Sequence, residues 1–302
     1  MGHKKIILLF GPTASGKSRL ALDIAKKFNG EIVNADSMQI YKEIKVLSAK
    51  PEDKSIKHHL YGFVSVKKIF SVGLWYKLAA KKINEINKKD KIAIVVGGTG
   101  LYFKILIDGL SEIPEVPTID MNLNPAGRFY MRNSYSRRYP GIFKGIPAND
   151  KQRLYRAISV YEHTGTPLWE WYEKKNKKKY FKSDEFTKIC LNPPKPELEI
   201  RIKKRFNEML KNGAIQEAEN FKKLNVDLIL SSNFIIGLKE ISEFLNKKIT
   251  MEELKKKVVI RSRQYAKRQF TWQRGQMQDW KGFADTNYLD LRKKTLSYLS
   301  KT

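Results

Sequence analysis

Apolar segments and helical patterns alternate along the first hundred residues. Apolar runs at residues 6–10 and 91–96 predict buried strands, and residues 31–37 predict a second short strand that ends in a polar turn. Residues 19–25 and 71–87 carry apolar side chains at helical spacing. Part of the apolar face of the second helix is expected to consist of Leu74, Leu78, Ile83 and Ile86. Strands that alternate with helices predict a parallel sheet with helices packed on it.

The second half of the chain is predicted to be mostly helical, with helices at residues 150–163, 197–210 and 251–274. On the longest of these, one stripe mixes apolar side chains with two arginines: Leu254, Val258, Arg261, Tyr265, Arg268 and Trp272. A merely solvated helix would not place arginines on its apolar stripe. Arg261 and Arg268 are therefore expected to face a buried anion.

The first strand runs directly into Gly-Pro-Thr-Ala-Ser-Gly-Lys-Ser, which matches the pattern G-x-x-x-x-G-K-S/T between a strand and a helix. Its glycines let backbone N–H groups converge on phosphate oxygens, and the helix N-terminus adds positive partial charge. Lys17 is expected to pair with phosphates and Ser18 with a bound Mg²⁺; an ordinary glycine-rich turn is the alternative. The predicted diphosphate ligands are Gly11, Pro12, Thr13, Ala14, Ser15, Gly16, Lys17 and Ser18. The fold class is thus α/β, with a P-loop NTPase-like parallel sheet core flanked by helices and a smaller, mostly helical, basic accessory region.

Charge changes this picture by indicating a partner. The 302 residues include 59 Lys and Arg against 31 Asp and Glu, a formal net charge of +28. An excess of this size favours a polyanion such as nucleic acid, although lysines spread over solvated helix faces are the simpler explanation. No apolar run reaches the roughly 18 residues of a membrane span, and no secretory signal is recognised. The single cysteine, Cys190, fits a reducing cytoplasm.

Which phosphate chemistry the loop serves depends on the carboxylates nearby. Phosphotransferases with this loop place a Mg²⁺-holding Asp after another core strand, but the buried strand at residues 91–96 ends in Gly97-Gly98-Thr99. Asp36, after the second strand, is the one well-placed acid. If Asp36 acts as a base, the loop is free to hold a diphosphate leaving group rather than a hydrolysable nucleotide. Asp36 as a helix cap, or as a Mg²⁺ holder through water, is the alternative.

Residues 114–147 differ in character from the rest of the chain. Proline, asparagine and glycine alternate there with arginines and aromatic residues, namely Arg128, Phe129, Tyr130, Arg132, Tyr135, Arg137, Arg138 and Tyr139. Cations interleaved with aromatic rings suit contacts with bases and backbone phosphates. A poorly ordered basic loop is the alternative.

Successive motifs along the chain resemble those of the tRNA dimethylallyltransferase (tRNA isopentenyltransferase) family. Besides residues 11–18, the matching blocks are Asn34-Ala35-Asp36-Ser37-Met38-Gln39-Ile40-Tyr41, Ser48-Ala49-Lys50-Pro51, His58-His59-Leu60, Gly97-Gly98-Thr99-Gly100-Leu101-Tyr102-Phe103, Asn149-Asp150-Lys151-Gln152-Arg153-Leu154 and Tyr265-Ala266-Lys267-Arg268-Gln269-Phe270-Thr271-Trp272. They occur in the family's order and cover nearly all of the chain outside residues 114–147. The family transfers a dimethylallyl group from dimethylallyl diphosphate to N6 of the adenosine 3′ of the anticodon (position 37), which gives N6-isopentenyladenosine.

Carried over residue by residue, the resemblance implies specific roles. Asp36 takes the proton from the adenine amine, Lys17 and Ser18 with its Mg²⁺ serve the diphosphate, and Arg201 is a plausible further diphosphate ligand. The residues implied for tRNA are Asp36, Ser37, Met38, Gln39, Thr99, Gln152, Arg153, Leu154, Tyr155 and Arg156. The adenine must leave its stem–loop to reach such a pocket, as in base flipping. A monomer is expected, although no sequence feature bears on the oligomeric state.

The chain also departs from the family pattern. Residues 1–113 are predicted as the first part of the core, residues 114–147 as a divergent, shortened insertion, and residues 148–302 as a helical region that completes the core and the tRNA surface. Phe234 stands where the family commonly has glutamine or arginine, and Leu238 where it has tyrosine. His58 and His59 lack cysteine or acidic partners at metal-ligand spacing, so a structural role is expected for them. The competing hypotheses are a P-loop phosphotransferase for a small molecule and a non-catalytic RNA-binding protein with a vestigial loop.

Overall fold

The computed structural model describes residues 6–53, 55–117, 119, 123–173, 177–228 and 230–302. They form two compact units, one made of Met1–Ile107 with Phe181–Thr302 and the other of Asp108–Tyr180. We call them the core unit and the helical unit and describe each by itself. The predicted insertion at residues 114–147 is therefore too short at both ends, and residues 148–180 belong to the helical unit rather than to the core.

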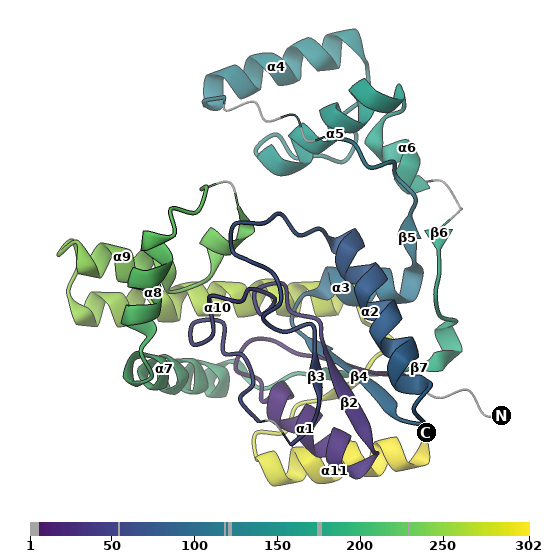
Figure 1. Ribbon diagram of the computed structural model, residues 1–302, viewed down its shortest axis with the longest axis vertical. Coiled ribbons are helices and arrows are strands. Elements are labelled where there is room, and N and C mark those ends of the chain that lie inside the picture. The colour runs from purple at the N-terminus through teal and green to yellow at the C-terminus, as the bar shows by residue number, and fades with distance from the viewer. Residues whose placement is uncertain (1–5, 54, 118, 120–122, 174–176, 229) are drawn as a thin grey trace. The chain divides into compact units, whose positions relative to one another are not determined.

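A six-stranded sheet in the order β3-β2-β4-β1-β7-β8 organises the core unit, and all of its strand pairs are parallel (Figure 1). Its strands are β1 (Ile6–Phe10), β2 (Gly30–Asn34), β3 (His58–His59), β4 (Ile92–Gly97), β7 (Phe186–Leu191) and β8 (Lys281–Phe283). The central strands β1, β2 and β4 are buried along almost their whole length, as the uninterrupted apolar sequences of β1 and β4 require. The α/β fold class predicted from the sequence is confirmed.

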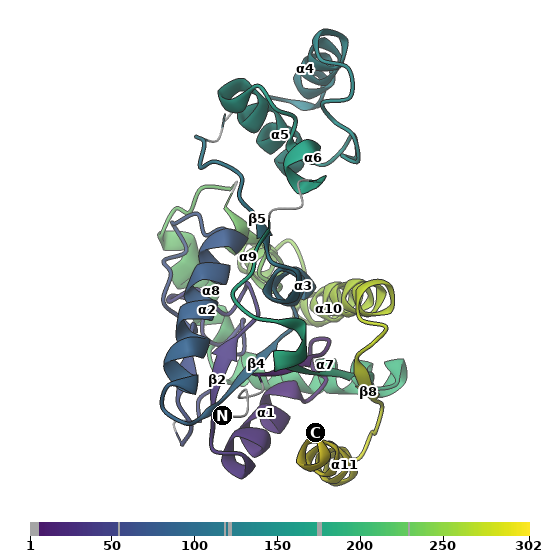
Figure 2. The ribbon, with the colours of Figure 1, turned by 90° about the vertical axis from the view of Figure 1, so that its right-hand side faces the viewer.

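Helices cover both faces of this sheet. On one face, α1 (Lys17–Lys27) and α11 (Tyr288–Lys301) pack against alternate apolar residues of the strands, and the two helices lie side by side in Figures 1 and 2. On the other face lie α2 (Val72–Asn87) and α3 (Gly100–Asp108). There the Trp75 indole donates to the carbonyl of Asn34 (2.8 Å) and the ring of Phe103 meets that of Phe10 edge-on.

The helix predicted at residues 71–87 is confirmed, but part of its buried face was assigned wrongly. Leu74 is 43% exposed, whereas its neighbours Trp75 and Tyr76 are fully buried. Ser71 fixes the start of the helix, because its hydroxyl accepts from the N–H of Leu74 (3.1 Å). From that start the two aromatic residues, rather than Leu74, face the sheet.

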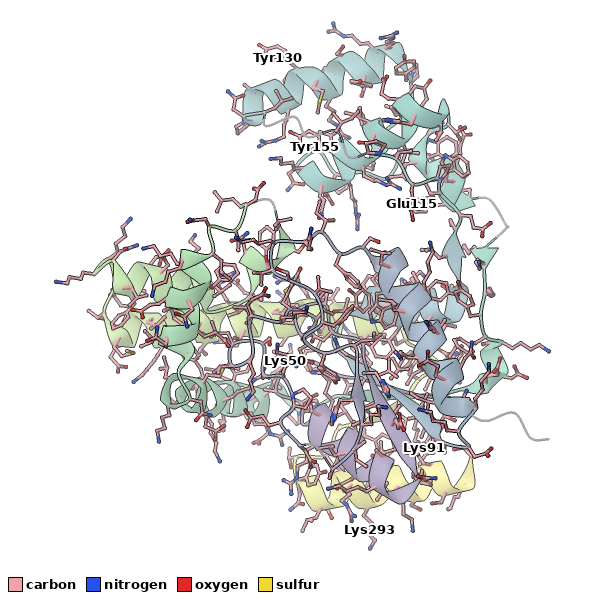
Figure 3. The ribbon with its side chains drawn as sticks, viewed as in Figure 1. Lys50, Lys91, Glu115, Tyr130, Tyr155 and Lys293 are labelled. Carbon is pink, nitrogen blue, oxygen red and sulfur yellow. The ribbon has the colours of Figure 1, made fainter. Side chains whose placement is uncertain are left out.

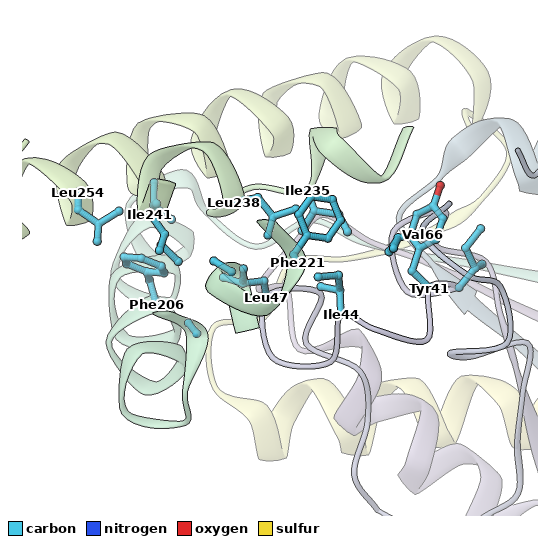
Figure 4. Packing of buried hydrophobic residues seen from close by; sticks show 14 of the residues in the cluster. Tyr41, Ile44, Leu47, Val66, Phe206, Phe221, Ile235, Leu238, Ile241 and Leu254 are labelled. Carbon is cyan, nitrogen blue, oxygen red and sulfur yellow. The ribbon is translucent and has the colours of Figure 1, made fainter. Parts of the chain in front are cut away.

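A second apolar cluster joins the C-terminal helices to the loop after β2. The helices are α7 (Lys195–Lys211), α8 (Ala214–Lys223), α9 (Leu238–Leu245) and α10 (Met251–Gln276), with short 3₁₀ turns at Ser183–Glu185 and Ser231–Phe234. Figure 4 shows side chains from separate helices, among them Phe206, Leu238 and Leu254, pointing into one cluster with Leu47 of the loop. This packing places α7 and α10 beside the carboxyl end of the sheet. None of the helices in the described ranges is long and apolar enough to cross a membrane.

The helical unit holds α4 (Pro125–Arg138), α5 (Lys151–Thr164) and α6 (Leu168–Glu173), with a two-stranded antiparallel pair of β5 (Leu110–Ser111) and β6 (Lys177–Lys178). The helix α4 was not predicted from the sequence, because its basic and aromatic residues form no apolar stripe. It begins at Pro125, and the Asn124 side chain caps it by accepting from the N–H of Gly127 (2.8 Å). The alternative of a poorly ordered basic loop does not hold for this helix.

The second glycine-rich turn is shaped by close backbone approach. A Cβ on Gly97 would lie 2.0 Å from the carbonyl oxygen of Ala35. We expect Gly97→Ala to lower the free energy of unfolding by about 3 kcal/mol, because neither backbone can move without disturbing the sheet. Urea denaturation measures this change.

Gly275, in the last turn of α10, is the matched control, since a Cβ there meets nothing within 4 Å. Gly275→Ala is expected to raise the free energy of unfolding by about 0.5 kcal/mol through helix propensity. Equal stability of the two variants would show that the close approach at Gly97 carries no cost.

Candidate active site

The phosphate loop, residues 11–18, leaves the centre of the sheet after β1 and enters α1. Ala14 (φ 62°) and Gly16 (φ 89°) adopt left-handed backbone conformations, and Lys17 is the first residue of the helix. The N–H groups in the first turn of a helix have no partner within the helix and carry positive partial charge. Ser15 Oγ is buried and has no hydrogen-bond partner among the described residues. The loop thus offers converging donors and an unpaired hydroxyl to an anion.

Lys17 points back into this loop, where its Nζ donates to the carbonyl of Pro12 (3.2 Å). Burial lowers the pKa of Lys17 to about 8; the nearby Asp36 carboxylate opposes this change and the Arg205 guanidinium adds to it. Two cations therefore face one carboxylate. A bound anion would favour the charged form of the lysine.

Arg205, on α7, lies beside the phosphate loop and donates from Nη1 to Thr13 Oγ1 (3.1 Å). Burial lowers its pKa, and the negative charge of Asp36 partly compensates. Arg201, the predicted diphosphate ligand, is one helical turn away and is engaged elsewhere. It donates to Glu197 Oε1 (2.8 Å) and to the carbonyl of Thr286 (2.7 Å). The structure places Arg205, rather than Arg201, next to the loop.

Asp36 follows β2 in a turn fixed by Asn34. The Asn34 side chain accepts from the N–H of Asp36 (2.9 Å) and donates to the carbonyls of Asp36 and Leu60 (3.0 Å each). One carboxylate oxygen of Asp36 accepts from the N–H of Met38 (3.0 Å). The carboxylate thus stabilises a turn rather than a helix, and it also lines a cavity.

This cavity, with a volume of about 380 Å³, joins the phosphate loop to Asp36. Its polar lining includes Thr13, Asp36, Ser48, Arg205, Arg261, Ser262, Gln264, Tyr265 and Arg268. Its apolar lining is Met38, Leu47, Ile202, Phe206, Met209, Phe234, Ile235, Ile236 and Val258. Such a lining suits a ligand with one anionic end and one apolar end.

The two arginines predicted to face a buried anion do line this cavity. Arg261 donates to Glu240 Oε1 (2.6 Å), and the other oxygen of that buried carboxylate accepts from the N–H of Gly237 (3.0 Å). The anion beside Arg261 is thus a side chain of the protein itself. Arg268 is exposed, with its guanidinium 5.5 Å from the centre of the Tyr265 ring.

Three tyrosines surround Asp36. Burial raises the pKa of Tyr61, Tyr102 and Tyr265, and the negative charge of Asp36 raises each pKa further. All three remain neutral phenols at physiological pH. Asp36 therefore lies among neutral phenol hydroxyls and aromatic rings.

The other residues predicted near the adenosine have separate roles in the structure. Thr99 Oγ1 accepts from the N–H of Ser37 (2.9 Å) and donates to Ser37 Oγ (3.2 Å). The Gln39 amide donates to the carbonyls of Ser48 and Ala49 (2.9 Å each), which fixes the following loop. Met38 joins Asp36 in the cavity lining, whereas Gln39 is committed to backbone partners.

The residues predicted to contact the anticodon loop belong to α5 of the helical unit. Gln152 and Arg153 are exposed and Arg156 is half-buried, but Leu154 and Tyr155 are buried in the core of that unit. Tyr155 is labelled in Figure 3. The prediction of a surface contact is wrong for these two side chains, because the helical period turns them toward the unit's own core.

The site suits a Mg²⁺ at Ser18 only if phosphate oxygens and water supply most of its ligands. Ser18 is exposed in the first turn of α1, and the described residues contain no group of three or more His, Cys, Asp or Glu that could hold a metal. Mg²⁺ commonly takes one or two protein ligands together with phosphate oxygens and water. The Ser18 hydroxyl suits a cation carried mainly by a diphosphate. His59, by contrast, has a structural partner, since its Nε2 lies 2.7 Å from the buried carboxylate of Glu31.

The sheet, loop and cavity define an α/β P-loop protein whose site combines anion binding with a carboxylate and an apolar wall. Residues 39–276 match the family model described as IPP transferase. A tRNA dimethylallyltransferase of Pelagibacter ubique is 44% identical over 286 residues, which cover 92% of this chain and 91% of the relative. One of Parvibaculum lavamentivorans is 40% identical over 303 residues, with 98% and 96% covered.

Solved structures agree with this match. The tRNA isopentenylpyrophosphate transferase of Bacillus halodurans superposes with a TM-score of 0.71 at 27% identity, covering 99% of this chain and 96% of the other. A eukaryotic dimethylallyltransferase described as acting on tRNA gives a TM-score of 0.77 at 28% identity, with 95% and 75% covered. The chain belongs to the IPP transferase family, whose members here are named tRNA dimethylallyltransferases, and it is an enzyme of the prenyl-transferring class.

Proposed function

We propose that this enzyme transfers the dimethylallyl group of dimethylallyl diphosphate to N6 of the adenosine 3′ of the anticodon, position 37 of tRNA. The observation that carries the proposal is the cavity of about 380 Å³, because it brings Thr13 and Arg205, Asp36 and an apolar wall to one space. A phosphotransferase for a small molecule is not favoured, since the relatives are named as prenyl transferases.

The diphosphate of the donor binds the phosphate loop. Lys17 and Arg205 supply positive charge, the backbone N–H groups at the start of α1 supply donors, and the Ser15 hydroxyl gains a partner. These groups stabilise the negative charge that builds up on the diphosphate as it leaves. A Mg²⁺ held by the diphosphate and Ser18 would neutralise part of the same charge. The five-carbon group then has apolar side chains such as Leu47, Phe206 and Ile235 to pack against.

Asp36 acts as the base for the acceptor. In the transfer the C1–O bond of the donor breaks, a bond forms between C1 and N6 of the adenine, and the proton of N6 passes to the Asp36 carboxylate. The adenine must be flipped out of the anticodon loop to reach this carboxylate. Neutral tyrosines around Asp36 leave it as the local proton acceptor.

The tRNA itself is bound through the positive field of the chain and through residues of each unit. We assign contacts to Asp36, Ser37, Met38 and Thr99 in the core unit, and to Gln152, Arg153 and Arg156 on the surface of α5. The exposed rings of Phe129 and Tyr130 on α4 suit stacking on bases; Tyr130 is labelled in Figure 3. The enzyme acts as a monomer in the cytoplasm, where the one thiol, Cys190, stays reduced and buried.

Incubation of the purified chain with bulk tRNA, dimethylallyl diphosphate and Mg²⁺ tests the function. Mass analysis is expected to detect a gain of about 68 Da on one adenosine, the net addition of a C₅H₈ unit. A parallel incubation with ATP and no prenyl donor is the control. Unmodified tRNA in the first reaction, or transfer of phosphate from ATP to a small molecule, would contradict the proposal.

The low pKa of Lys17 predicts how donor capture depends on pH. Only the ammonium form pairs with a diphosphate, and above pH 8 the free enzyme loses this proton. We therefore expect kcat/KM for the donor to fall about tenfold per pH unit above pH 8, because this ratio reports the pKa values of the free enzyme. Initial rates between pH 7 and 9.5 measure the effect.

Lys17→Arg is the control for this profile, since a guanidinium stays charged throughout that range. The falling limb is expected to disappear in this variant even if its overall rate is lower. A wild-type profile that stays flat to pH 9.5 would remove Lys17 from donor capture.

A further inference from the structure

One buried side chain connects the phosphate loop to the turn that leads toward Asp36. Gln269, on α10, is 4% exposed. Its Oε1 accepts from the N–H of Thr13 (2.8 Å), and its Nε2 donates to the carbonyl of Gly98 (2.9 Å). Thr13 lies in the phosphate loop after β1, and Gly98 lies in the turn after β4. A single amide therefore joins two loops from neighbouring strands.

The chain of hydrogen bonds continues from the Gly98 turn to the backbone on either side of Asp36. The next residue, Thr99, donates its N–H to the carbonyl of Ala35 (3.2 Å) and binds Ser37 through its hydroxyl. Asp36 lies between these two partners in the sequence. A displacement of the Gly98 turn would therefore pass through Thr99 to the backbone on both sides of Asp36.

The turn is built around this amide. A Cβ on Gly98 would lie 2.1 Å from Nε2 of Gln269, and one on Gly100 would lie 2.2 Å from the ring of Trp272, one helical turn further along α10. A buried N–H and a buried carbonyl both need partners. The glutamine side chain carries an acceptor and a donor on one plane and serves both, whereas a glutamate offers two acceptors and a methionine offers neither.

We propose that Gln269 is a positioning residue, which sets the separation between the bound diphosphate and the Asp36 carboxylate by bonding Thr13 and Gly98 at once. The inference rests on the proposed function, because it concerns the alignment of donor and acceptor in that reaction. Gln269 affects the rate of transfer more than the binding of either substrate, since a shift of about 1 Å between reacting groups can cost roughly 100-fold in rate.

The test compares Gln269→Met with Gln276→Met, the same change on an exposed residue of α10 that pairs with Lys104. Single-turnover rates are measured with both substrates saturating, and pyrophosphate and tRNA affinities are measured separately. We expect the transfer rate of Gln269→Met to fall roughly 100-fold while both affinities stay within about threefold of wild type. Gln276→Met is expected to match wild type.

Gly98→Ala provides an independent route to the same defect, because the new Cβ displaces the Gln269 amide. We expect its rate loss to resemble that of Gln269→Met and the double variant to be no slower than either single one, as for groups that act as a unit. Gln269→Glu keeps the shape of the side chain and an acceptor for the N–H of Thr13, but it loses the donor to the carbonyl of Gly98. Its rate of transfer is therefore expected to fall as well.

A folded Gln269→Met that transfers at the wild-type rate would overturn the inference. So would a loss of rate that only follows a loss of folded protein in both Gln269 variants, because that result defines a purely structural role. If the wild-type chain leaves tRNA unmodified, the proposed function fails and the inference falls with it. An active wild type with a fully active Gln269→Met defeats the inference alone.

Discussion

Asp36→Asn is expected to abolish prenyl transfer, with a loss of about a thousandfold or more in the single-turnover rate. The amide keeps the size of the side chain and an oxygen that accepts from the N–H of Met38, so the turn is preserved. It cannot take up the proton from the adenine amine at neutral pH. General-base catalysis contributes roughly 10²- to 10⁴-fold to such reactions, which sets the expected magnitude.

Binding measurements separate this effect from loss of the site. Pyrophosphate affinity, by calorimetry, and tRNA affinity, by filter binding, are both expected to stay near wild type in Asp36→Asn. Asp36→Ala loses the contact with Met38 as well and should be no more active. Retained turnover in Asp36→Asn would remove Asp36 from the mechanism as the base.

Arg205→Gln is expected to weaken binding of the donor by roughly 100-fold, because charge-assisted hydrogen bonds contribute about 1.5–3 kcal/mol. The guanidinium lies at Thr13 Oγ1 on the edge of the phosphate loop, and the arginine is half-buried, which limits competition from water. Glutamine keeps some hydrogen-bonding capacity but removes the charge. Calorimetry with pyrophosphate measures the loss directly.

Arg201→Gln is the matched control, one turn away on the same helix. Its guanidinium is bound to Glu197 and to the carbonyl of Thr286, so pyrophosphate affinity is expected to change less than about threefold. If Arg201→Gln bound pyrophosphate more weakly than Arg205→Gln, Arg201 rather than Arg205 would be the diphosphate ligand.

The first half of the sheet was largely predictable, because its strands and helices carry strong local signals, whereas the strands β7 and β8 were not predicted. The runs at β1 and β4 are apolar throughout, and Ser71 and Asp150 cap helices that begin where the pattern indicates. The helix α4 escaped prediction because only Met131 on it is buried, so its sequence contains no apolar stripe. The boundary of the helical unit also escaped, since the packing that defines it joins residues far apart in the sequence.

The site was predictable where chemistry depends on a contiguous motif. The phosphate loop and Asp36 each follow a strand, and parallel strands bring their carboxyl ends to one edge of the sheet. Arg205 and Gln269 each form a hydrogen bond with Thr13, from 192 and 256 residues away along the chain, and no local sequence pattern predicts such contacts. The arginine pair at i and i+4 on α7 was visible in the sequence, but which of the two faces the loop is decided by how α7 packs.

The central claim is that the phosphate loop binds the diphosphate of the donor while the Asp36 carboxylate takes the proton from the N6 amine of a tRNA adenine. It is tested most directly with a synthetic anticodon stem–loop RNA that carries either adenosine or guanosine 3′ of the anticodon, incubated with dimethylallyl diphosphate and Mg²⁺. Nuclease digestion followed by mass analysis is predicted to find the prenyl group on the adenosine substrate with wild-type enzyme, and on neither substrate with Asp36→Asn. Equal prenylation of the guanosine substrate, or no prenylation of either RNA by the wild-type enzyme, would contradict it.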